Sequence, residues 1–298
     1  MSAILPRLRP STALAAGGLA VGIYTVSRFV MGDSTMRADS GAPTKVFSGG
    51  PAFVSLPLES SERVNHNTKR LRFKLPSPDA VSGLPLTSAL LTVSWPKGSW
   101  TPVARPYTPV TPSDEPGHID FLVKHYPSGK QSTHLHSLTP GETLLFALPL
   151  KGPQWKPPAA SANPEHITLI AGGAGITPVY QLAQGILRDP SDTTTSMTLV
   201  FGVNTDADVL LRDQFRDYER RFPGRFRAVY AVTSPGEGSP HRKGRVTREL
   251  LDEVVPEAGR GRVFVCGPPA MEAALVGKRG SPGILEQLGY KKDRIHRF

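Results

Sequence analysis

The spacing of apolar residues divides the chain into regions. Up to about residue 150, apolar and polar positions alternate in short runs separated by Pro and Gly, most clearly in Arg70-Leu-Arg-Phe-Lys-Leu75. Alternation with this period is typical of half-buried strands. We therefore expect an antiparallel barrel, with strands at residues 53–58, 68–75, 89–95, 119–125 and 143–148.

From His166 onward, short continuous apolar runs alternate with longer amphipathic stretches. The runs at residues 167–171, 197–201, 226–231 and 262–265 are predicted as strands, and the stretches at 178–187, 210–222 and 246–255 as helices. Such alternation predicts a Rossmann-like parallel α/β sheet. The sequence thus predicts a barrel domain at residues 51–152, an interdomain loop at 153–166 and an α/β domain at 167–298.

A different pattern occupies the N-terminus. Residues 1–32 contain no acidic residue, carry Arg7 and Arg9 early, and include an apolar stretch at 13–31. An acid-free basic start is typical of a mitochondrial presequence, and an apolar stretch of this length approaches what spans a bilayer. We prefer a single anchor in a mitochondrial membrane (outer, or facing the intermembrane space) to a cleaved presequence. Residues 33–50 then form a flexible linker.

Composition narrows the chemistry. The net charge is +10, of which residues 51–298 carry +7. A basic surface attracts nucleic acid, anionic lipid or an acidic protein, but the aromatic residues are not interleaved with basic ones as nucleic-acid stacking requires. We expect an acidic protein partner and no nucleic acid. The single cysteine excludes an internal disulfide and a cysteine-ligated iron–sulfur cluster, and His134 and His136 lack zinc-like spacing, so no metal site is expected.

Arg105-Pro-Tyr-Thr108 is the first candidate site. Pro106 keeps the backbone extended, which places Arg105 and Tyr107 on one side of the strand and Thr108 on the other. A guanidinium suits a pyrophosphate, and a tyrosine ring can pack against a flat cofactor. The alternative is an edge strand with a surface arginine.

A second anion-directed feature follows at Gly129-Lys-Gln-Ser132, before a helix expected at residues 133–138. A turn entering a helix points successive amides and a hydroxyl at one spot. Gly129 permits the turn and a close approach of the backbone. The sequence therefore predicts two anion contacts within one barrel.

Two further turns end strands of the α/β domain. Gly172-Gly-Ala-Gly-Ile-Thr-Pro178 opens a helix, and Cys266-Gly-Pro-Pro-Ala-Met271 follows the strand at 262–265. Ligands of parallel sheets bind at the carboxyl ends of strands, and glycines let a dinucleotide approach a helix N-terminus. The spacing is not Gly-x-Gly-x-x-Gly, and a lone cysteine is commonly a small core residue. The prediction of a nucleotide site therefore depends on the motifs occurring together.

These motifs, in this order, resemble the NADH–cytochrome b5 reductase family of the ferredoxin–NADP reductase superfamily, from about Phe53 to Phe298. The resemblance implies a Greek-key FAD-binding barrel followed by an NAD-binding domain. It implies an enzyme in which NADH reduces FAD by hydride transfer and electrons leave singly to a separate haem protein such as cytochrome b5. An FAD-binding assembly factor for a mitochondrial haem protein and an NADPH-linked reductase remain alternatives.

The resemblance also implies roles for individual residues. Arg105 contacts the FAD pyrophosphate, with Tyr107 against the isoalloxazine ring and Thr108 near its reactive nitrogen. Cys266 lies by the nicotinamide and helps to place it for hydride transfer. Thr108 and Cys266 are the catalytic candidates; the cofactor-binding candidates are Arg105, Pro106, Tyr107, Thr108, Lys124, Tyr126, Gly129, Lys130, Gln131, Ser132, Gly172, Gly173, Ala174, Gly175, Thr177, Pro178, Asp208, Cys266, Gly267, Pro268, Met271 and Phe298.

Several positions qualify this assignment. Asp208, with Asp206 as the second candidate, resembles the acid that accepts from the ribose 2′-hydroxyl and favours NADH, although an aspartate capping the following helix is the alternative. Ala174 stands where the family usually has Thr, which predicts weaker NADH binding. Thr87-Ser88-Ala89 stands where the family usually has a Gly. Asn65-His-Asn-Thr68 resembles the family's opening strand and equally fits a polar turn.

Overall fold

The computed structural model describes residues 42–48, 50–157, 164–255, 261–278 and 280–298. The expected N-terminal anchor and most of the expected linker lie outside these residues. Within the described part of the chain, no helix is long and apolar enough to cross a membrane.

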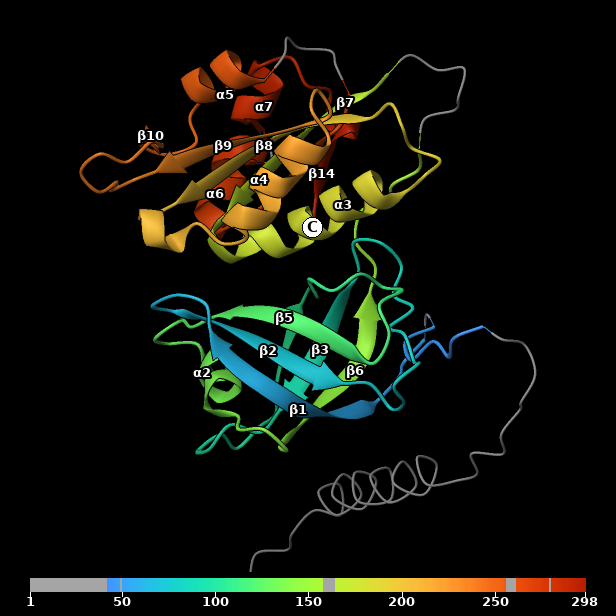
Figure 1. The fold of residues 1–298 in the computed structure, drawn as a ribbon. Helices are drawn as coiled ribbons and strands as arrows, with labels where there is room; N and C mark the ends of the chain where they lie inside the picture. The colour runs from blue at the N-terminus through green and yellow to red at the C-terminus, as the bar shows by residue number, and fades with distance from the viewer. Residues whose placement is uncertain (1–41, 49, 158–163, 256–260, 279) are drawn as a thin grey trace, which may run out of the picture. The chain divides into compact units, whose positions relative to one another are not determined.

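The first half of the described chain is a six-stranded antiparallel sheet with strand order β4-β3-β6-β1-β2-β5 (Figure 1). The expected antiparallel barrel is therefore confirmed as a curved, barrel-like sheet. One helix, α2, accompanies it and contacts β4 and β5. The elements are β1 (Val54–Arg63), β2 (Thr68–Lys74), β3 (Ala89–Ser94), β4 (Val103–Tyr107), β5 (His118–Lys124), α2 (Lys130–Ser137) and β6 (Thr143–Leu150).

Aromatic rings fill the interior of this half. Phe73, Phe121 and Phe146 are almost fully buried, and the Phe146 ring centroid lies 5.3 Å from that of Phe73 and 5.5 Å from that of Phe121. Each of these rings comes from a different strand at an inward position of the alternation. Burial of such side chains stabilises the fold by roughly 1.5–3 kcal/mol each.

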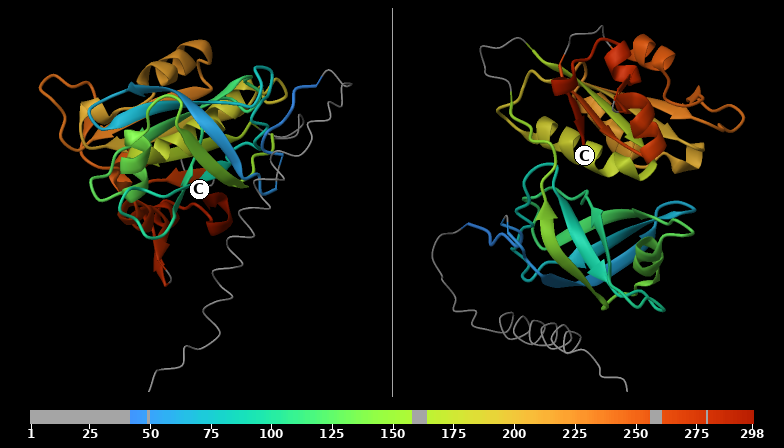
Figure 2. Two further views of the ribbon diagram at one scale, coloured as in Figure 1. Left: turned by 90° about the horizontal axis from the view of Figure 1, so that it is seen from below. Right: turned by 180° about the vertical axis from the view of Figure 1, so that it is seen from behind.

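The second half is a six-stranded parallel sheet with strand order β10-β9-β8-β7-β11-β14. This confirms the expected parallel α/β domain. Figure 2 shows this half with its helices from below and from behind. Its strands are β7 (His166–Gly172), β8 (Ser196–Val203), β9 (Phe226–Val232), β10 (Arg242–Lys243), β11 (Val263–Cys266) and β14 (Ile295–Arg297). Its helices are α3 (Ile176–Arg188), α4 (Arg212–Arg221), α5 (Arg248–Val254), α6 (Pro269–Val276) and α7 (Ile284–Gln287).

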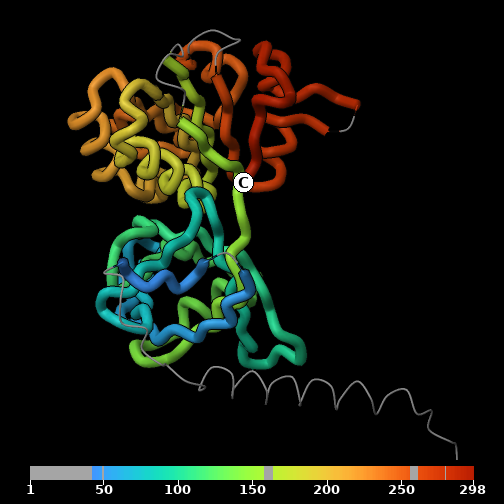
Figure 3. The backbone as a smooth tube through the Cα atoms, turned by 90° about the vertical axis from the view of Figure 1, so that its right-hand side faces the viewer, coloured from blue at the N-terminus to red at the C-terminus, as the bar shows by residue number. Residues whose placement is uncertain are grey.

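Two apolar clusters cover the two faces of the parallel sheet. On β7, Leu169 belongs to the cluster that includes residues of α3 and α4, and the adjacent Ile170 belongs to the cluster that includes residues of α5, α6 and α7. Because successive strand residues point to opposite faces, a continuous apolar run is the expected sequence of a strand buried on both sides. The backbone enters this half from the end of β6 through residues 151–165, part of which lies outside the described residues (Figure 3).

Several elements were not expected from the sequence. Strand β14 has three residues, and α7 has four, so neither shows a readable period. Helix α2 begins at Lys130 and α3 at Ile176, each a few residues before the expected start. A short 3-10 turn, η1 (Gly173–Gly175), precedes α3 and occupies the glycine motif.

Thr87 occupies the left-handed region of backbone conformation, with φ of 66°. This region favours glycine and is strained for a β-branched residue. The Thr87 hydroxyl donates to the carbonyl of Pro153 at 2.6 Å, and Thr87 is buried. The hydrogen bond offsets part of the strain and ties the loop before β3 to the segment that follows β6.

Candidate functional site

The Arg105-Pro-Tyr-Thr108 motif lies on β4, an edge strand of the barrel sheet, with Thr108 just beyond its end. The Arg105 side chain is exposed and donates to the carbonyl of its neighbour Ala104 at 2.7 Å. Tyr107 is half-buried against the barrel core. The strand thus presents a solvent-accessible positive charge and, two residues on, an aromatic ring.

The Gly129–Ser132 turn enters α2, and two of its side chains make hydrogen bonds within the barrel half. The Gln131 side chain is buried: its amide donates to Thr92 Oγ1 at 2.9 Å, and its carbonyl oxygen accepts from Ser94 Oγ at 2.6 Å. Ser132 Oγ accepts from the Tyr126 amide at 3.1 Å. Both side chains therefore hold the turn in place, and the expected cofactor contacts of Gln131 and Ser132 stay predictions.

What remains for an anion at this turn is the backbone and Lys130. No side chain caps α2, and the first amides of a helix have no partner within the helix. The Lys130 side chain is exposed. A Cβ on Gly129 would lie 2.6 Å from Ser132 Oγ, so glycine is required by close packing at this position. Its φ of −88° is accessible to any residue.

The two turns predicted for the nicotinamide nucleotide pack directly against each other. Cys266 on β11 pairs with Ala171 on β7, so both strands end at the same level of the sheet. A Cβ on Gly175 would lie 2.3 Å from the Cys266 carbonyl oxygen, and one on Gly172 would lie 2.5 Å from Met271 Sδ. Gly173, with φ of 53°, faces open space because a Cβ there would meet no heavy atom within 4 Å. The turn is therefore closely packed at Gly172 and Gly175 and open at Gly173.

The remaining residues of these turns lie beside them. Thr177 and Pro178 are buried in the first turn of α3, and Thr177 Oγ1 donates to the Ala174 carbonyl at 3.2 Å. Pro268 is exposed and Gly267 half-buried. The Phe298 amide donates to the Val265 carbonyl at 3.3 Å, which places the C-terminal aromatic residue next to the end of β11.

Electrostatics connect the barrel motif with the Cys266 turn. Burial, with a smaller contribution from Tyr126, raises the pKa of Tyr107 to about 12. Burial also raises the pKa of Tyr126, and the nearby Cys266 thiol contributes in the same direction. Tyr126 therefore lies within electrostatic reach of one residue from each half. The pKa of the Cys266 thiol is raised to about 12 by burial and then by Glu272, so this thiol is neutral at physiological pH.

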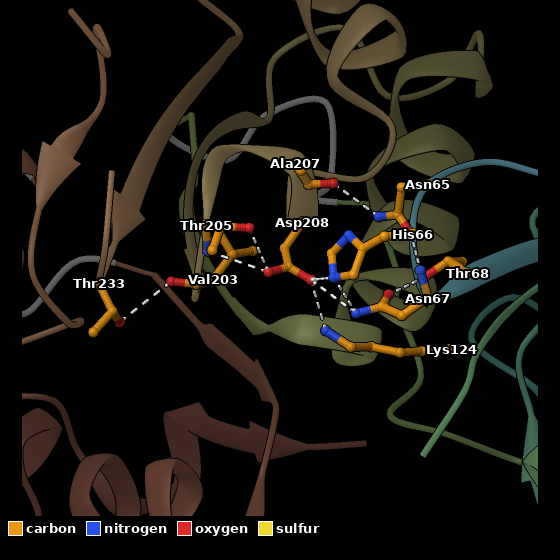
Figure 4. Close-up of polar contacts among 10 residues, drawn as sticks. All are labelled: Asn65, His66, Asn67, Thr68, Lys124, Val203, Thr205, Ala207, Asp208 and Thr233. Atoms are coloured by element: carbon orange, nitrogen blue, oxygen red, sulfur yellow. Dashed lines mark hydrogen bonds and ion pairs between the residues drawn. The ribbon is translucent and has the colours of Figure 1, made fainter. Parts of the chain in front are cut away.

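Asp208 is held from both halves of the chain (Figure 4). Its Oδ1 accepts from Lys124 Nζ at 3.0 Å and from Asn67 Nδ2 at 3.2 Å, and its Oδ2 accepts from the amide and hydroxyl of Thr205 at 3.2 and 2.9 Å. Burial alone would raise the pKa of Asp208, but the hydrogen bonds from Lys124, Thr205 and Asn67 outweigh it and lower the pKa to about 2. The carboxylate completes a capping box at the turn η2 (Asp206–Asp208), whose N-cap is Thr205. It does not cap the following helix α4, whose N-cap is Leu211.

Asp206 and Lys124 also have hydrogen-bond or ion-pair partners within the protein. Asp206 accepts from the Gly236 amide and the Ser239 hydroxyl, both at 2.6 Å. Lys124 Nζ is paired with Asp208, and its side chain is 16% exposed. The expected ribose contact of Asp208 and cofactor contact of Lys124 therefore stay predictions that require this pair to separate.

The sequence did not identify Asn65, Asn67 or Glu272 as site residues. The two asparagines lie in a motif that fitted a polar turn equally well, and their partners on η2 are more than 140 residues away. Glu272 Oε1 accepts from the Gly267 amide at 3.1 Å and lies within electrostatic reach of Cys266. Its place in the first turn of α6 was a readable signal, since acidic residues are favoured at helix N-termini.

The residues present suit two dinucleotides. On the barrel, exposed Arg105, exposed Lys130 and the uncapped amides of α2 provide positive potential for a diphosphate, and Tyr107 provides a ring surface. On the parallel sheet, the open face of Gly173 lies beside the start of α3, where a helix N-terminus favours a diphosphate. The donor set and the open glycine turn fit FAD and NADH.

Comparisons with known protein families agree with this division. Residues 55–156 match the family described as "Oxidoreductase FAD-binding domain", and residues 169–276 match "Oxidoreductase NAD-binding domain". Among curated proteins, the "NADH-cytochrome b5 reductase 2" of Emericella nidulans is 45% identical over 296 residues, covering 96% of this chain and 89% of that protein. The protein of the same name from Botryotinia fuckeliana is 47% identical over 262 residues, covering 85% and 74%.

Solved structures show the same fold. The cytochrome b5 reductase domain of Ulva prolifera nitrate reductase has a TM-score of 0.72 and 27% identity, covering 86% of this chain and 100% of that one. The CS-b5R domains of human Ncb5or have a TM-score of 0.69 at 24% identity, covering 88% and 71%; at this identity the likeness concerns the fold alone.

Proposed function

The chain belongs to the NADH-cytochrome b5 reductase family and is an FAD-dependent NADH reductase, and from this premise we propose how its residues divide the work and which acceptor it serves. The observation that carries the division is the presence of one set of candidate groups on each sheet: exposed Arg105 and the uncapped start of α2 on the barrel, and the Gly175 turn packed on the Cys266 carbonyl on the parallel sheet.

The barrel residues hold the flavin cofactor. Arg105 and the first amides of α2 bind its diphosphate, and Lys130 adds a charge at the same turn. The side chains of Gln131 and Ser132 position this turn, because they bond to Ser94 on β3 and to the Tyr126 amide. Tyr107 stays protonated at physiological pH because its pKa is about 12, so its ring packs as a neutral surface.

The turns of the parallel sheet hold the nicotinamide nucleotide. Gly172–Gly175 bring the backbone close to the ligand, and the start of α3 faces its diphosphate. The neutral Cys266 thiol gives the nicotinamide an uncharged contact that excludes water. Thr108, at the end of β4, offers a hydroxyl on the barrel side. Bound FAD supplies hydride acceptance and the release of single electrons, and the protein supplies orientation.

Ala174 weakens this arrangement. Its side chain is half-buried in η1 and carries no hydrogen-bonding group, and its carbonyl accepts from Thr177 Oγ1 at 3.2 Å. Thr177 therefore does not replace the missing hydroxyl, because its own is directed at the backbone. We propose that NADH binds less tightly for this reason.

We propose a b5-type haem protein as the electron acceptor. The relatives that cover this chain carry cytochrome b5 in their names, and residues 51–298 carry a net charge of +7. A basic surface accelerates encounter with an acidic partner, and this effect weakens as salt is added.

Stopped-flow absorbance of the full-length holoenzyme under anaerobic conditions tests the proposal. NADH should bleach the bound flavin faster than NADPH does, and subsequent mixing with cytochrome b5 should restore the oxidised spectrum at a rate that falls with ionic strength. A flavin that neither nucleotide bleaches would contradict the division of roles. Flavin reduction without reoxidation by cytochrome b5 would contradict the acceptor alone.

We also propose that residues 1–42 attach the enzyme to a mitochondrial membrane. The support is the acid-free, apolar sequence of residues 1–32. Carbonate extraction of mitochondria that contain the full-length chain tests this proposal. The full chain should stay in the membrane pellet, whereas a chain that lacks residues 2–42 should appear in the supernatant; release of both would contradict attachment through this segment.

A further inference from the structure

The loop between β1 and β2 and the end of β5 bind η2, which belongs to the parallel-sheet half (Figure 4). Asn65 Nδ2 donates to the Ala207 carbonyl at 2.8 Å, Asn67 Nδ2 donates to Asp208 Oδ1 at 3.2 Å, and Lys124 Nζ lies 3.0 Å from the same oxygen. Three barrel residues thus hold two adjacent residues of one turn. Asn65, Asn67 and Lys124 are called the barrel latch below.

The latch residues are held in place by their own surroundings. The Asn67 amide donates to Asn65 Oδ1 at 3.0 Å, and Thr68 Oγ1 donates to Asn67 Oδ1 at 3.0 Å. The Asn67 carbonyl accepts from the amide of His125, the residue after Lys124, at 2.7 Å. These bonds link the β1–β2 loop to β5, so that the three side chains reach η2 as one unit.

The Asp208 carboxylate has its acceptor capacity filled. A carboxylate offers about four lone-pair positions, and four donors from Thr205, Lys124 and Asn67 occupy them. A further nitrogen, His66 Nε2, lies 3.8 Å from Asp208 Oδ1, and the Asp208 side chain is only 4% exposed. A ribose hydroxyl can therefore reach this carboxylate only if a present donor leaves.

The donors differ in how they can leave. The two bonds from Thr205 belong to η2 itself and move with Asp208. The bonds from Asn67 and Lys124 come from the barrel and are lost when η2 and the barrel separate. Release at Oδ1 frees both the carboxylate and the ammonium of Lys124, which are complementary to a ribose hydroxyl and a phosphate.

We propose that Asn65 and Asn67 are positioning residues of the nucleotide site, which act through η2: the barrel latch holds Asp208 in the nucleotide-free enzyme and opens when NAD(H) binds. This inference rests on the proposed ribose contact of Asp208. A ligand shifts an equilibrium by its differential affinity for the two states. Latch bonds that exist only in the closed state therefore oppose nucleotide binding, and their removal strengthens it.

The test is calorimetric titration of NAD⁺ into the oxidised full-length holoenzyme, in the wild type and the Asn65→Ala/Asn67→Ala variant. Since hydrogen bonds to a charged group are among the stronger ones, the variant should bind NAD⁺ about three- to tenfold more tightly. Asp114→Asn is the matched control. It breaks the Asp114–Arg188 pair, which also joins the barrel half to α3 but has side chains 73% and 51% exposed. An exposed pair contributes little, so this control should bind NAD⁺ as the wild type does, within twofold.

Equal or weaker NAD⁺ binding by the double variant would overturn the latch, because a purely structural role predicts loss of affinity. If the double variant loses FAD on purification, the single variant Asn65→Ala replaces it in the test. Of the bonds between the barrel and η2, this variant removes the one from Asn65 Nδ2 to the Ala207 carbonyl. Hydrogen exchange gives a second readout on the wild type. NAD⁺ should speed exchange of the Val64 and Asn65 amides, which bond to the Thr68 carbonyl; slower or unchanged exchange would count against opening.

The outcomes separate the latch from the proposed function. If NADH does not reduce the flavin of the wild-type holoenzyme, both the proposed function and the latch are refuted. A wild-type flavin that NADH reduces, together with variants that bind NAD⁺ no more tightly, would refute the latch alone.

Discussion

Replacement of Gly175 by alanine is the most direct test of the contact between the two nucleotide turns. The new Cβ would lie 2.3 Å from the carbonyl oxygen of Cys266, whereas ordinary contact begins at 3.4 Å. The backbone of one turn must therefore move by about 1 Å, because a main-chain carbonyl has no alternative rotamer.

Two effects oppose each other in the stability of Gly175→Ala. Gly175 has φ of −63° and ψ of −4°, which alanine adopts readily, so the loss of unfolded-state freedom stabilises the variant by about 0.4–1 kcal/mol. Overpacking a tight site costs about 1–3 kcal/mol. The net destabilisation is therefore about 0–2.6 kcal/mol, which corresponds to a fall in Tm of up to about 10 °C.

The effect on nucleotide binding should be larger than the effect on stability. A displacement of about 1 Å at a positioning group costs up to about a hundredfold in rate, so we expect NAD⁺ affinity and the rate of flavin reduction by NADH each to fall at least about tenfold. FAD should be retained, because β4 and α2 belong to the other half of the chain.

The assay combines thermal unfolding, flavin content and stopped-flow reduction of the full-length holoenzyme. Gly236→Ala is the matched control, since its Cβ would meet only Asp206 Oδ2 at the ordinary distance of 3.5 Å. Unchanged Tm and NAD⁺ affinity in Gly175→Ala would refute the reasoning. Equal losses in both variants would show that any added methyl group disturbs this half.

Three further predictions concern single groups of the site. Ala174→Thr should restore a hydroxyl at η1 and lower the KM for NADH a few-fold with little change in flavin content; unchanged steady-state and single-turnover kinetics would contradict the role given to this position. Cys266, with a pKa of about 12, should react with iodoacetamide at pH 8 at least about a hundredfold more slowly than a free cysteine, because the thiolate is the nucleophile. A rate equal to that of free cysteine would show that the thiol is not buried. Because the pKa of Asp208 falls from 3.8 to about 2 on folding, its ionised form stabilises the protein by about 2 kcal/mol above pH 4, and this contribution is lost as the pH falls toward 2. The difference in urea stability between the wild type and Asp208→Asn should therefore narrow below pH 4, and a difference that stays constant from pH 7 to pH 3 would refute the assignment.

Local pattern predicted the architecture of both halves. Alternation in Arg70-Leu-Arg-Phe-Lys-Leu75 identified a strand of the barrel, and the continuous apolar run before Gly172 identified a strand of the parallel sheet. The glycine turn and the Cys266 turn were readable as a pair because parallel strands present their carboxyl ends at one edge. These features depend on residues near one another in the sequence, where side-chain period and turn chemistry act directly.

The sequence by itself therefore determined which segments form the strands, which turns end them, and which residue types meet at the sheet edge. Only the tertiary structure decided where several polar side chains point. Gln131 turns inward because Thr92 and Ser94 lie across the barrel, and Asp208 is held by Asn67, 141 residues away. A buried polar group takes whatever partner the fold brings within hydrogen-bonding distance, and no period along the chain encodes that partner.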